Sequence, residues 1–201
     1  MSRRKSPRPR VTRAGACSWP SGDPLMERYH DREWGTPVRR DTKIFEFLVL
    51  ESAQAGLSWR TILYKREGYR KSFANFNPTR VARFKGSDVK RPLKNPRIVG
   101  SRLKIEATVN NAKKFLEVQK EFGTFSKYMW SFVGGKVIDG KRKSLKTLPA
   151  TTKESDAFSK DLKERGFKFL GSTVVYAHMQ AVGMVNDHVQ TCFRYKELKK
   201  L

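Results

Sequence analysis

The sequence predicts an all-α fold. Apolar residues recur at helical spacing in several segments, and capping residues and glycines mark the ends of these segments. No run of alternating polar and apolar residues indicates a sheet, and the best strand candidates are short stretches at 135–137 and 167–170. The 201 residues, 38% of them apolar, suffice for one domain with a packed core or for two small lobes that share a core.

Most of the predicted helices begin at a residue whose side chain can accept a hydrogen bond from the first turn. Helices are expected at about 41–55, 59–66, 87–92, 101–120, 125–132, 151–165 and 172–182, with others starting near 78 and 187. Their expected starting residues are Asp41, Ser58, Asn77, Ser87, Ser101, Thr151 in a capping box with Glu154, and Ser172. The glycines expected to end three of them are Gly56, Gly166 and Gly183.

The chain is strongly basic. Lysine and arginine total 43 against 19 acidic residues, which gives a net charge of +24 and a pI near 10.4. A surplus of this size indicates a polyanionic partner, nucleic acid first and an anionic membrane surface second. A basic proteome or a device for solubility would also explain it. No apolar run approaches the ~20 residues of a membrane helix, and the N-terminus does not resemble a secretory signal.

Residues 1–15 are expected to form a disordered basic tail, and residues 16–201 a single domain. Six Lys or Arg lie between Arg3 and Arg13, and no acid precedes Asp23. The tail could be a nuclear address, an organelle transit peptide or a DNA-gripping arm. Pro7 and Pro9 disfavour the amphipathic helix of a transit peptide, but the other two roles stay open.

The densest basic stretch contains a short turn between two predicted helices. Nine Lys or Arg and one acid occur between residues 80 and 104, and the turn lies near 93–102. Such a unit resembles a helix-hairpin-helix, which holds a DNA phosphate on backbone amides at a helix N-terminus. A plain solvated turn is the alternative. The residues expected to contact DNA are Arg97, Gly100, Ser101, Arg102 and Lys104.

Both cysteines and two of the three histidines lie near the two ends of the chain. Cys17 and His30 are near the N-terminus, and His188 and Cys192 are spaced i, i+4 on the last predicted helix. Four such ligands can hold one structural zinc ion per chain, which would clasp the two ends. Spacing alone equally allows scattered core residues, and His178 is expected to be a buried or cleft residue.

Two cysteines at opposite ends do not suggest a disulfide framework. We therefore expect a reducing intracellular compartment, which would be the cytoplasm of a bacterium, or the nucleus or a DNA-containing organelle of a eukaryote.

One carboxylate interrupts an apolar helix stripe. Ile44, Phe47, Leu48, Glu51 and Ala55 share one face of the helix predicted at 41–55, and four of the five suit a core. Glu51 is either a buried acid with an ordinary partner or a functional group at the edge of a pocket.

Several segments resemble the type I 3-methyladenine DNA glycosylases, the constitutive alkylation-repair family of bacteria. The matching segments include "YHDREWGTP" (29–37), "LESAQAGLSWRTILYKREGYR" (50–70), "RGFKF" (165–169) and "GMVNDH" (183–188). The resemblance spans about residues 17–192. It implies a two-lobed helical fold of the helix-hairpin-helix glycosylase superfamily, with a base pocket between the lobes.

The resemblance also implies the roles of individual residues. Glu51 stands at the family's pocket-acid position and would act in catalysis, while the zinc ligands would be Cys17, His30, His188 and Cys192. The aromatic walls of the base pocket would be Tyr29, Trp34 and Trp59. Met26 occupies a substrate-binding position where the family usually has tyrosine, so base preference or rate could differ.

The implied reaction is hydrolysis of the N-glycosidic bond of 3-methyladenine in double-stranded DNA by a monomeric enzyme. No Asp occurs between Asp88 and Asp139, in agreement with the type I branch, which lacks the superfamily's catalytic Asp. We therefore expect monofunctional action that leaves an abasic site. A membrane partner is not expected. The alternatives are a non-catalytic DNA-damage-binding module of the same fold and a basic protein associated with RNA or the ribosome.

Overall fold

The computed structural model describes residues 17–200, so the predicted tail at 1–15 lies outside the described residues. The described chain is mostly helical, as predicted, and no helix in it is both long and apolar enough to cross a membrane. Its elements in order are α1 (Pro24–Arg32), α2 (Asp41–Gln54), α3 (Trp59–Ser72), η1 (Ala74–Phe76), α4 (Pro78–Val81), α5 (Gly86–Leu93), α6 (Arg102–Phe122), α7 (Phe125–Ser131), β1 (Ile138–Asp139), η2 (Leu145–Thr147), α8 (Lys153–Glu164), α9 (Ser172–Ala181), β2 (Val185–Asn186) and α10 (Phe193–Leu198).

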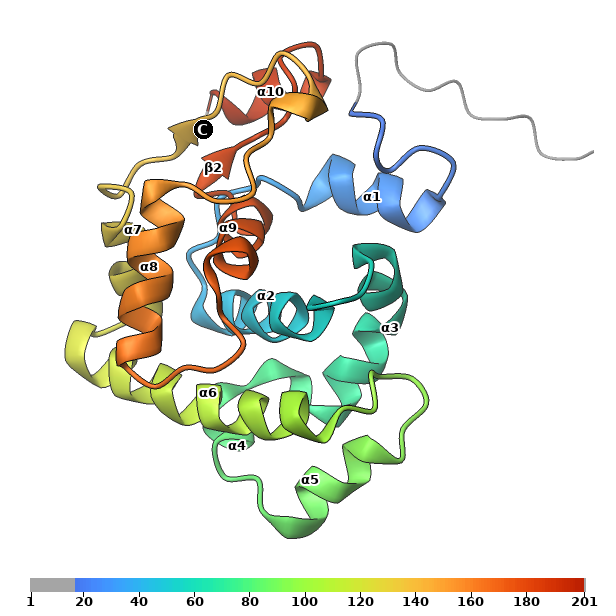
Figure 1. The fold of residues 1–201 in the computed structure, drawn as a ribbon, viewed down its shortest axis with the longest axis vertical. Coiled ribbons are helices and arrows are strands. Elements are labelled where there is room, and N and C mark those ends of the chain that lie inside the picture. Colours follow the sequence, from blue (N-terminus) through green and yellow to red (C-terminus); the bar gives the residue numbers. More distant parts are fainter. Residues whose placement is uncertain (1–16, 201) are drawn as a thin grey trace, which may run out of the picture.

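Helix α2 lies near the middle of the molecule and packs against α3, α6, α7 and α9 (Figure 1). Every residue from 44 to 53 is buried, so α2 is covered on all sides. Phe45 packs on Phe115 of α6, whose ring stacks on Phe125 of α7 with centroids 4.1 Å apart. This packing fixes the position of every side chain on α2, including Glu51.

The sheet of the described residues consists of two short parallel strands. Ile138 of β1 pairs with Val185 of β2, and Asp139 pairs with Asn186. The strand expected at 135–137 thus occurs slightly later in the chain. The strand expected at 167–170 does not form, because Asn111 of α6 binds that backbone instead: its side chain accepts from Lys168 N and donates to Lys168 O, both at 2.8 Å.

Three of the predicted helix caps are confirmed and four are not. Ser58, Asn77 and Ser101 accept backbone hydrogen bonds in the first turns of α3, α4 and α6. The starting residues of α5, α8 and α9 are Lys85, Thr152 and Gly171 in place of Ser87, Thr151 and Ser172. Asp41 was the wrong cap for α2: its carboxylate accepts from Phe125 N at 2.8 Å and Ser126 N at 2.9 Å, so it caps α7.

The last predicted helix does not begin at Asp187. Residues 187–192 form a turn, and α10 begins only at Phe193. The buried Asp187 carboxylate instead accepts from Arg142 Nε and Gln180 Nε2, each at 2.7 Å, and from the hydroxyl of Tyr176. These tertiary contacts outweigh the local preference for a helix. Helix α1 was not expected, although Asp23 followed by Pro24 is a recognisable start signal.

A partly buried ion-pair network joins α1, α2 and α3. Arg66 of α3 donates from Nε to Glu46 of α2 and from Nη2 to Glu33, each at 2.7 Å. Burial alone would raise the pKa of Glu33, but the hydrogen bonds and charge of Arg66, together with Lys43, lower it to about 2. The network holds α1 at a fixed position over α2 and α3.

Arg66→Ala should therefore lower the free energy of unfolding by about 3 kcal/mol, because it leaves the Glu46 carboxylate buried with weaker compensation. Urea denaturation measures this change. Arg102→Ala removes an exposed pair with Glu106 and should change stability by less than ~0.5 kcal/mol. Equal losses for the two variants would contradict the structural role of the network.

Candidate base pocket and metal centre

A cavity of about 330 Å³ lies between α1, α2, α3, α9 and the turn at η2. Its size suits a small-molecule or base pocket. Four of the five residues predicted for the base site line it, together with six others. The lining residues are Trp19, Tyr29, Trp34, Glu51, Gln54, Trp59, Leu145, Leu148, Ala177 and Gln180.

Glu51 reaches the cavity from the last turn but one of α2. Glu51 is 3% exposed, and its carboxyl group has no hydrogen-bond or ion-pair partner among the described residues. Burial raises its pKa to about 8, from an ordinary value of 4.5. The acid is therefore mostly protonated at neutral pH. A cation entering the cavity would favour its ionised form.

Aromatic rings form the walls around Glu51. The rings of Tyr29 and Trp59 lie 5.2 Å apart, and those of Trp19 and Trp34 lie 5.3 Å apart. Burial, and then the charge of Glu51, raises the pKa of Tyr29 well above its ordinary value, so its hydroxyl stays neutral. The buried Nε1 of Trp59 has no hydrogen-bond acceptor within residues 17–200. The cavity thus offers stacking faces, an unpaired donor and an unpaired acid.

Met26 does not line the cavity, although it was predicted to bind substrate. It lies one turn before Tyr29 on α1, and its side chain is buried in the core. The methionine at this position therefore leaves the observed walls intact.

Sequence reasoning missed six lining residues. Gln54 lies one turn after Glu51 on the same helix face, so helical spacing could have identified it. The others come from segments brought together only by tertiary contacts: Trp19, Leu145, Leu148, Ala177 and Gln180.

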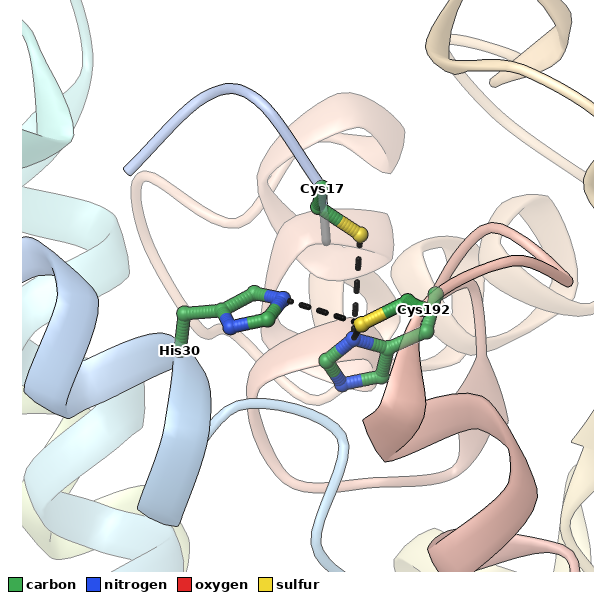
Figure 2. Close-up of side chains that lie close together, drawn as sticks. Cys17, His30 and Cys192 are labelled. Carbon is green, nitrogen blue, oxygen red and sulfur yellow. Dashed lines mark hydrogen bonds between the residues drawn. The ribbon is translucent and has the colours of Figure 1, made fainter. Parts of the chain in front are cut away.

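The four predicted metal ligands lie together in a buried cluster. Their ligand atoms are all within 4.8 Å of one another, and no other cluster of at least three potential ligands occurs in residues 17–200. Figure 2 shows the side chains of Cys17, His30 and Cys192 pointing toward one another. His188 and Cys192 were predicted to face the same way because of their i, i+4 spacing on a helix. They do lie together, but in the turn after β2 and not on a helix.

The distances in the cluster fit a zinc site. Cys192 Sγ lies 3.6 Å from His30 Nε2 and 3.6 Å from His188 Nδ1, and Cys17 Sγ lies 3.8 Å from His188 Nδ1. Tetrahedral zinc places a thiolate sulfur and an imidazole nitrogen about 3.5 Å apart.

Both imidazoles are oriented from outside the cluster. His30 Nδ1 donates to Asp31 at 2.8 Å, and His188 Nε2 donates to the carbonyl of Trp34 at 3.1 Å. These bonds leave the inner nitrogen of each ring free to bind a metal. His178 lies elsewhere, buried on α9, where burial lowers its pKa to about 3.

The turn between α5 and α6 lies against α3. A side chain at Gly68 would place its Cβ 2.1 Å from the carbonyl oxygen of Arg97, so glycine permits this approach. Ile98 is buried beneath the turn, and Arg102 pairs with Glu106. The Lys104 ammonium donates to the carbonyls of Ala53 and Ala55 at the end of α2, at 2.8 and 2.6 Å, in place of facing outward.

Comparisons with known proteins agree with this fold. The family model described as methyladenine glycosylase matches residues 19–195. The chain is 45% identical to DNA-3-methyladenine glycosylase 1 of Escherichia coli (strain K12), over 89% of this chain and 96% of the other. It is 43% identical to the DNA-3-methyladenine glycosylase of Haemophilus influenzae (strain ATCC 51907 / DSM 11121 / KW20 / Rd), over 88% and 95% of the two chains.

Solved structures agree as well. A crystal structure of 3-methyladenine DNA glycosylase I superposes with a TM-score of 0.86 at 47% sequence identity. The match covers 89% of this chain and 98% of the chain in that structure. The Staphylococcus aureus enzyme, described for its 3-methyladenine recognition, has a TM-score of 0.86 and 38% identity, with 90% and 96% covered.

The fold is that of a DNA glycosylase, a hydrolase class that acts on N-glycosyl bonds. Within that class the chain belongs to the methyladenine glycosylase family, which confirms the resemblance found in its sequence.

The raised pKa of Glu51 predicts a pH-dependent stability. Below pH 4.5 the acid is protonated in both the folded and the unfolded chain, and between 4.5 and about 8 only the folded chain keeps the proton. The contribution of Glu51 to stability therefore falls as the pH rises through this interval. Relative to Glu51→Gln, the parent chain should lose at most ~5 kcal/mol by about pH 8.

Urea denaturation of both chains at several pH values tests this prediction. Other titrating groups are shared by the two chains and cancel in the difference. A stability difference that does not change between about pH 5 and 8 would contradict a buried, unpaired Glu51.

Proposed function

We propose that the chain hydrolyses the N-glycosidic bond of 3-methyladenine in double-stranded DNA and leaves an abasic site without cutting the strand. The observation that supports this most is the buried, unpaired Glu51 carboxyl group among aromatic rings in a base-sized cavity. A solved relative described as bound to 3-methyladenine, with a TM-score of 0.86, supports the same substrate.

The chemistry of the substrate reduces what the enzyme must do. Adenine alkylated at N3 is a cation in DNA, and its glycosidic bond is weakened because the base departs as a neutral molecule. Strong acid catalysis of the leaving group is therefore unnecessary. The enzyme must extrude the nucleotide, recognise the base and stabilise an electron-poor sugar.

Glu51 would supply both recognition and charge. In the free cavity it is mostly neutral, because burial raises its pKa to about 8. A cationic base beside it would favour the carboxylate, which can accept hydrogen bonds from the adenine edge and counter the positive charge. Neutral adenine offers no such charge, so the same acid would discriminate against undamaged bases.

The aromatic walls would favour the same cation. Tyr29, Trp34 and Trp59 present ring faces or edges to the cavity, and each contact with a cation can be worth about 0.5–2 kcal/mol. The unpaired Nε1 of Trp59 is a further donor for an acceptor atom of the base.

The cluster of Cys17, His30, His188 and Cys192 would hold one structural zinc ion. Two thiolates and two imidazoles complete a tetrahedron, so no position remains for substrate or water. These residues join the start of the described chain to the turn before α10. Zinc would thus clasp the two ends of a single domain and take no part in the chemistry.

The turn between α5 and α6 would bind a DNA phosphate as a helix-hairpin-helix. Ser101 caps α6, and the backbone near Gly100 lies at the positive end of that helix dipole. Arg97 and Arg102 flank it, whereas Lys104 would stabilise the hairpin through α2.

We further propose that the enzyme acts as a monomer with two helical lobes, in a reducing intracellular compartment.

Release of free 3-methyladenine from methylated duplex DNA tests the proposal. The parent chain should release the base, and Glu51→Ala should lower the single-turnover rate at least ~100-fold, because it removes a preorganised charge. Binding to undamaged DNA should change little.

Glu117→Gln, which alters an exposed acid of α6, serves as the matched control and should keep the parent rate. A folded, zinc-loaded chain that binds methylated DNA but releases no base would be a non-catalytic damage-binding module, and the proposal would fail.

Metal removal tests the clasp separately. Elemental analysis should find about one zinc per chain, and Cys192→Ser should lose the metal and unfold at a lower temperature. Chelation should lower the unfolding temperature of the parent chain, and added zinc should restore it. A metal-free chain with an unchanged unfolding temperature would rule out a structural zinc site.

A further inference from the structure

Residues 140–148, here called the strap, form one side of the cavity. The strap leaves β1, contains η2 and leads toward α8. Leu145 and Leu148 line the cavity, and Leu145 also packs against the buried cluster of Cys17, Val189 and Cys192. In Figure 1 this gold-to-orange segment passes beside α10 before it descends to α8.

The strap is fixed to the body of the protein by contacts at its start. Arg142 Nε donates to Asp187 at 2.7 Å, and its Nη2 donates to the Tyr176 hydroxyl at 3.1 Å. The carbonyl of Arg142 accepts from Gln190 N at 2.8 Å. At Gly140 a Cβ would lie 2.1 Å from Asp187 Oδ1, so glycine is required there. The strap is therefore a positioned element of the pocket.

The turn inside the strap separates its apolar and basic side chains. Thr147 N donates to Ser144 O and Leu148 N to Leu145 O, both at 3.2 Å, which forms the short helical turn η2. Leu145 and Leu148, three residues apart, both reach the cavity. Lys143 and Lys146 are exposed.

Neither of these two ammonium groups has a carboxylate partner in the described part of the chain. The sequence also contains no acid between Asp139 and Glu154. The charge of Arg142 is compensated by Asp187, so Lys143 and Lys146 are the uncompensated cations nearest in sequence to the two lining leucines.

We infer that the strap is a phosphate-binding lip of the base pocket, in which Lys143 and Lys146 hold backbone phosphates that flank the extruded nucleotide. The inference rests on the proposed function. A base inside the cavity places its sugar at the opening, and the phosphates on either side of that sugar must lie just outside it. Lys146 lies between the two cavity-lining leucines, and Lys143 two residues before the first.

The lip differs from the hairpin in what it recognises. The hairpin can bind a phosphate of any duplex, because it requires no change in the DNA. The lip meets its phosphates only when a nucleotide has rotated toward the cavity. Its lysines should therefore stabilise the extruded state more than the undamaged duplex, and so favour the step that precedes hydrolysis.

Salt-dependent binding tests this inference. The probe is a short duplex with a stable abasic-site analogue, which stands for the DNA with its base removed from the stack. The double variant Lys143→Gln with Lys146→Gln should reduce the slope of log affinity against log salt by up to ~1.8, since each lost phosphate contact removes about 0.9. Its affinity at moderate salt should fall by about tenfold.

The matched control is Lys120→Gln with Lys127→Gln, which removes the same charge from exposed positions on α6 and α7, away from the cavity-lining elements. The control should keep the parent slope. A variant with Lys143→Arg and Lys146→Arg should also keep it, because arginine retains the charge. On an undamaged duplex the glutamine pair at the strap should change the slope less than on the abasic duplex.

Equal slopes for the strap and control pairs would overturn the inference, as would equal effects on damaged and undamaged duplexes. Base release by the parent chain distinguishes the two proposals. If the parent chain releases 3-methyladenine but the strap and control pairs have equal salt slopes, the phosphate-binding lip is wrong and the proposed enzyme activity stands. If no base is released but the slopes differ, the enzyme activity is wrong and the phosphate contacts of the strap stand.

Discussion

The burial of α2 is the constraint on which the rest of the site depends. All residues from 44 to 53 are buried, and the helix packs against α3, α6, α7 and α9. This packing holds the Glu51 carboxyl group in a place where no cation or hydrogen-bond donor of residues 17–200 would compensate its ionised form. The apolar residues stabilise the helix enough to keep an acid in an unfavourable position, and a cation beside the carboxyl group would relieve that cost.

The base pocket and the metal-ligand cluster share a wall. Trp34 lines the cavity, its ring lies 4.5 Å from the ring of His188, and its carbonyl accepts a hydrogen bond from the same histidine. Trp19 packs edge-on against both His30 and Trp34. The cluster that joins the two ends of the described chain therefore also positions two of the rings around Glu51.

Periodicity and local chemistry were enough to predict part of this structure. The helices around Glu51 and Trp59 follow from apolar spacing and from Ser58 as a cap, and Glu51 was recognisable because it interrupts an apolar stripe. The position of both cysteines and two histidines near the chain ends suggested the four residues of the cluster. The resemblance to known glycosylases supported that set and identified most of the aromatic walls.

The remaining features depend on contacts between distant segments. Asp41 caps α7 in place of its own helix, and Asp187 binds Arg142 in place of starting a helix. Local sequence contains no sign of either partner. The same limitation hid Leu145 and Leu148, because the position of the strap is set by that Arg142–Asp187 pair. Met26 is not among the residues that line the cavity, and a substitution at a family position does not reveal which way its side chain faces.

The central claim is that Glu51 is neutral in the free protein and ionises when a cationic base binds. A carbon-13 NMR titration of the Glu51 carboxyl group tests this claim most directly, with the signal assigned by comparison with a Glu51→Gln chain. The signal should titrate near pH 8 in the free protein and at a clearly lower pH with the 3,9-dimethyladeninium cation, which keeps the charge of the damaged nucleoside. A free-protein value near 4.5, unchanged by the cation, would contradict the role assigned to Glu51.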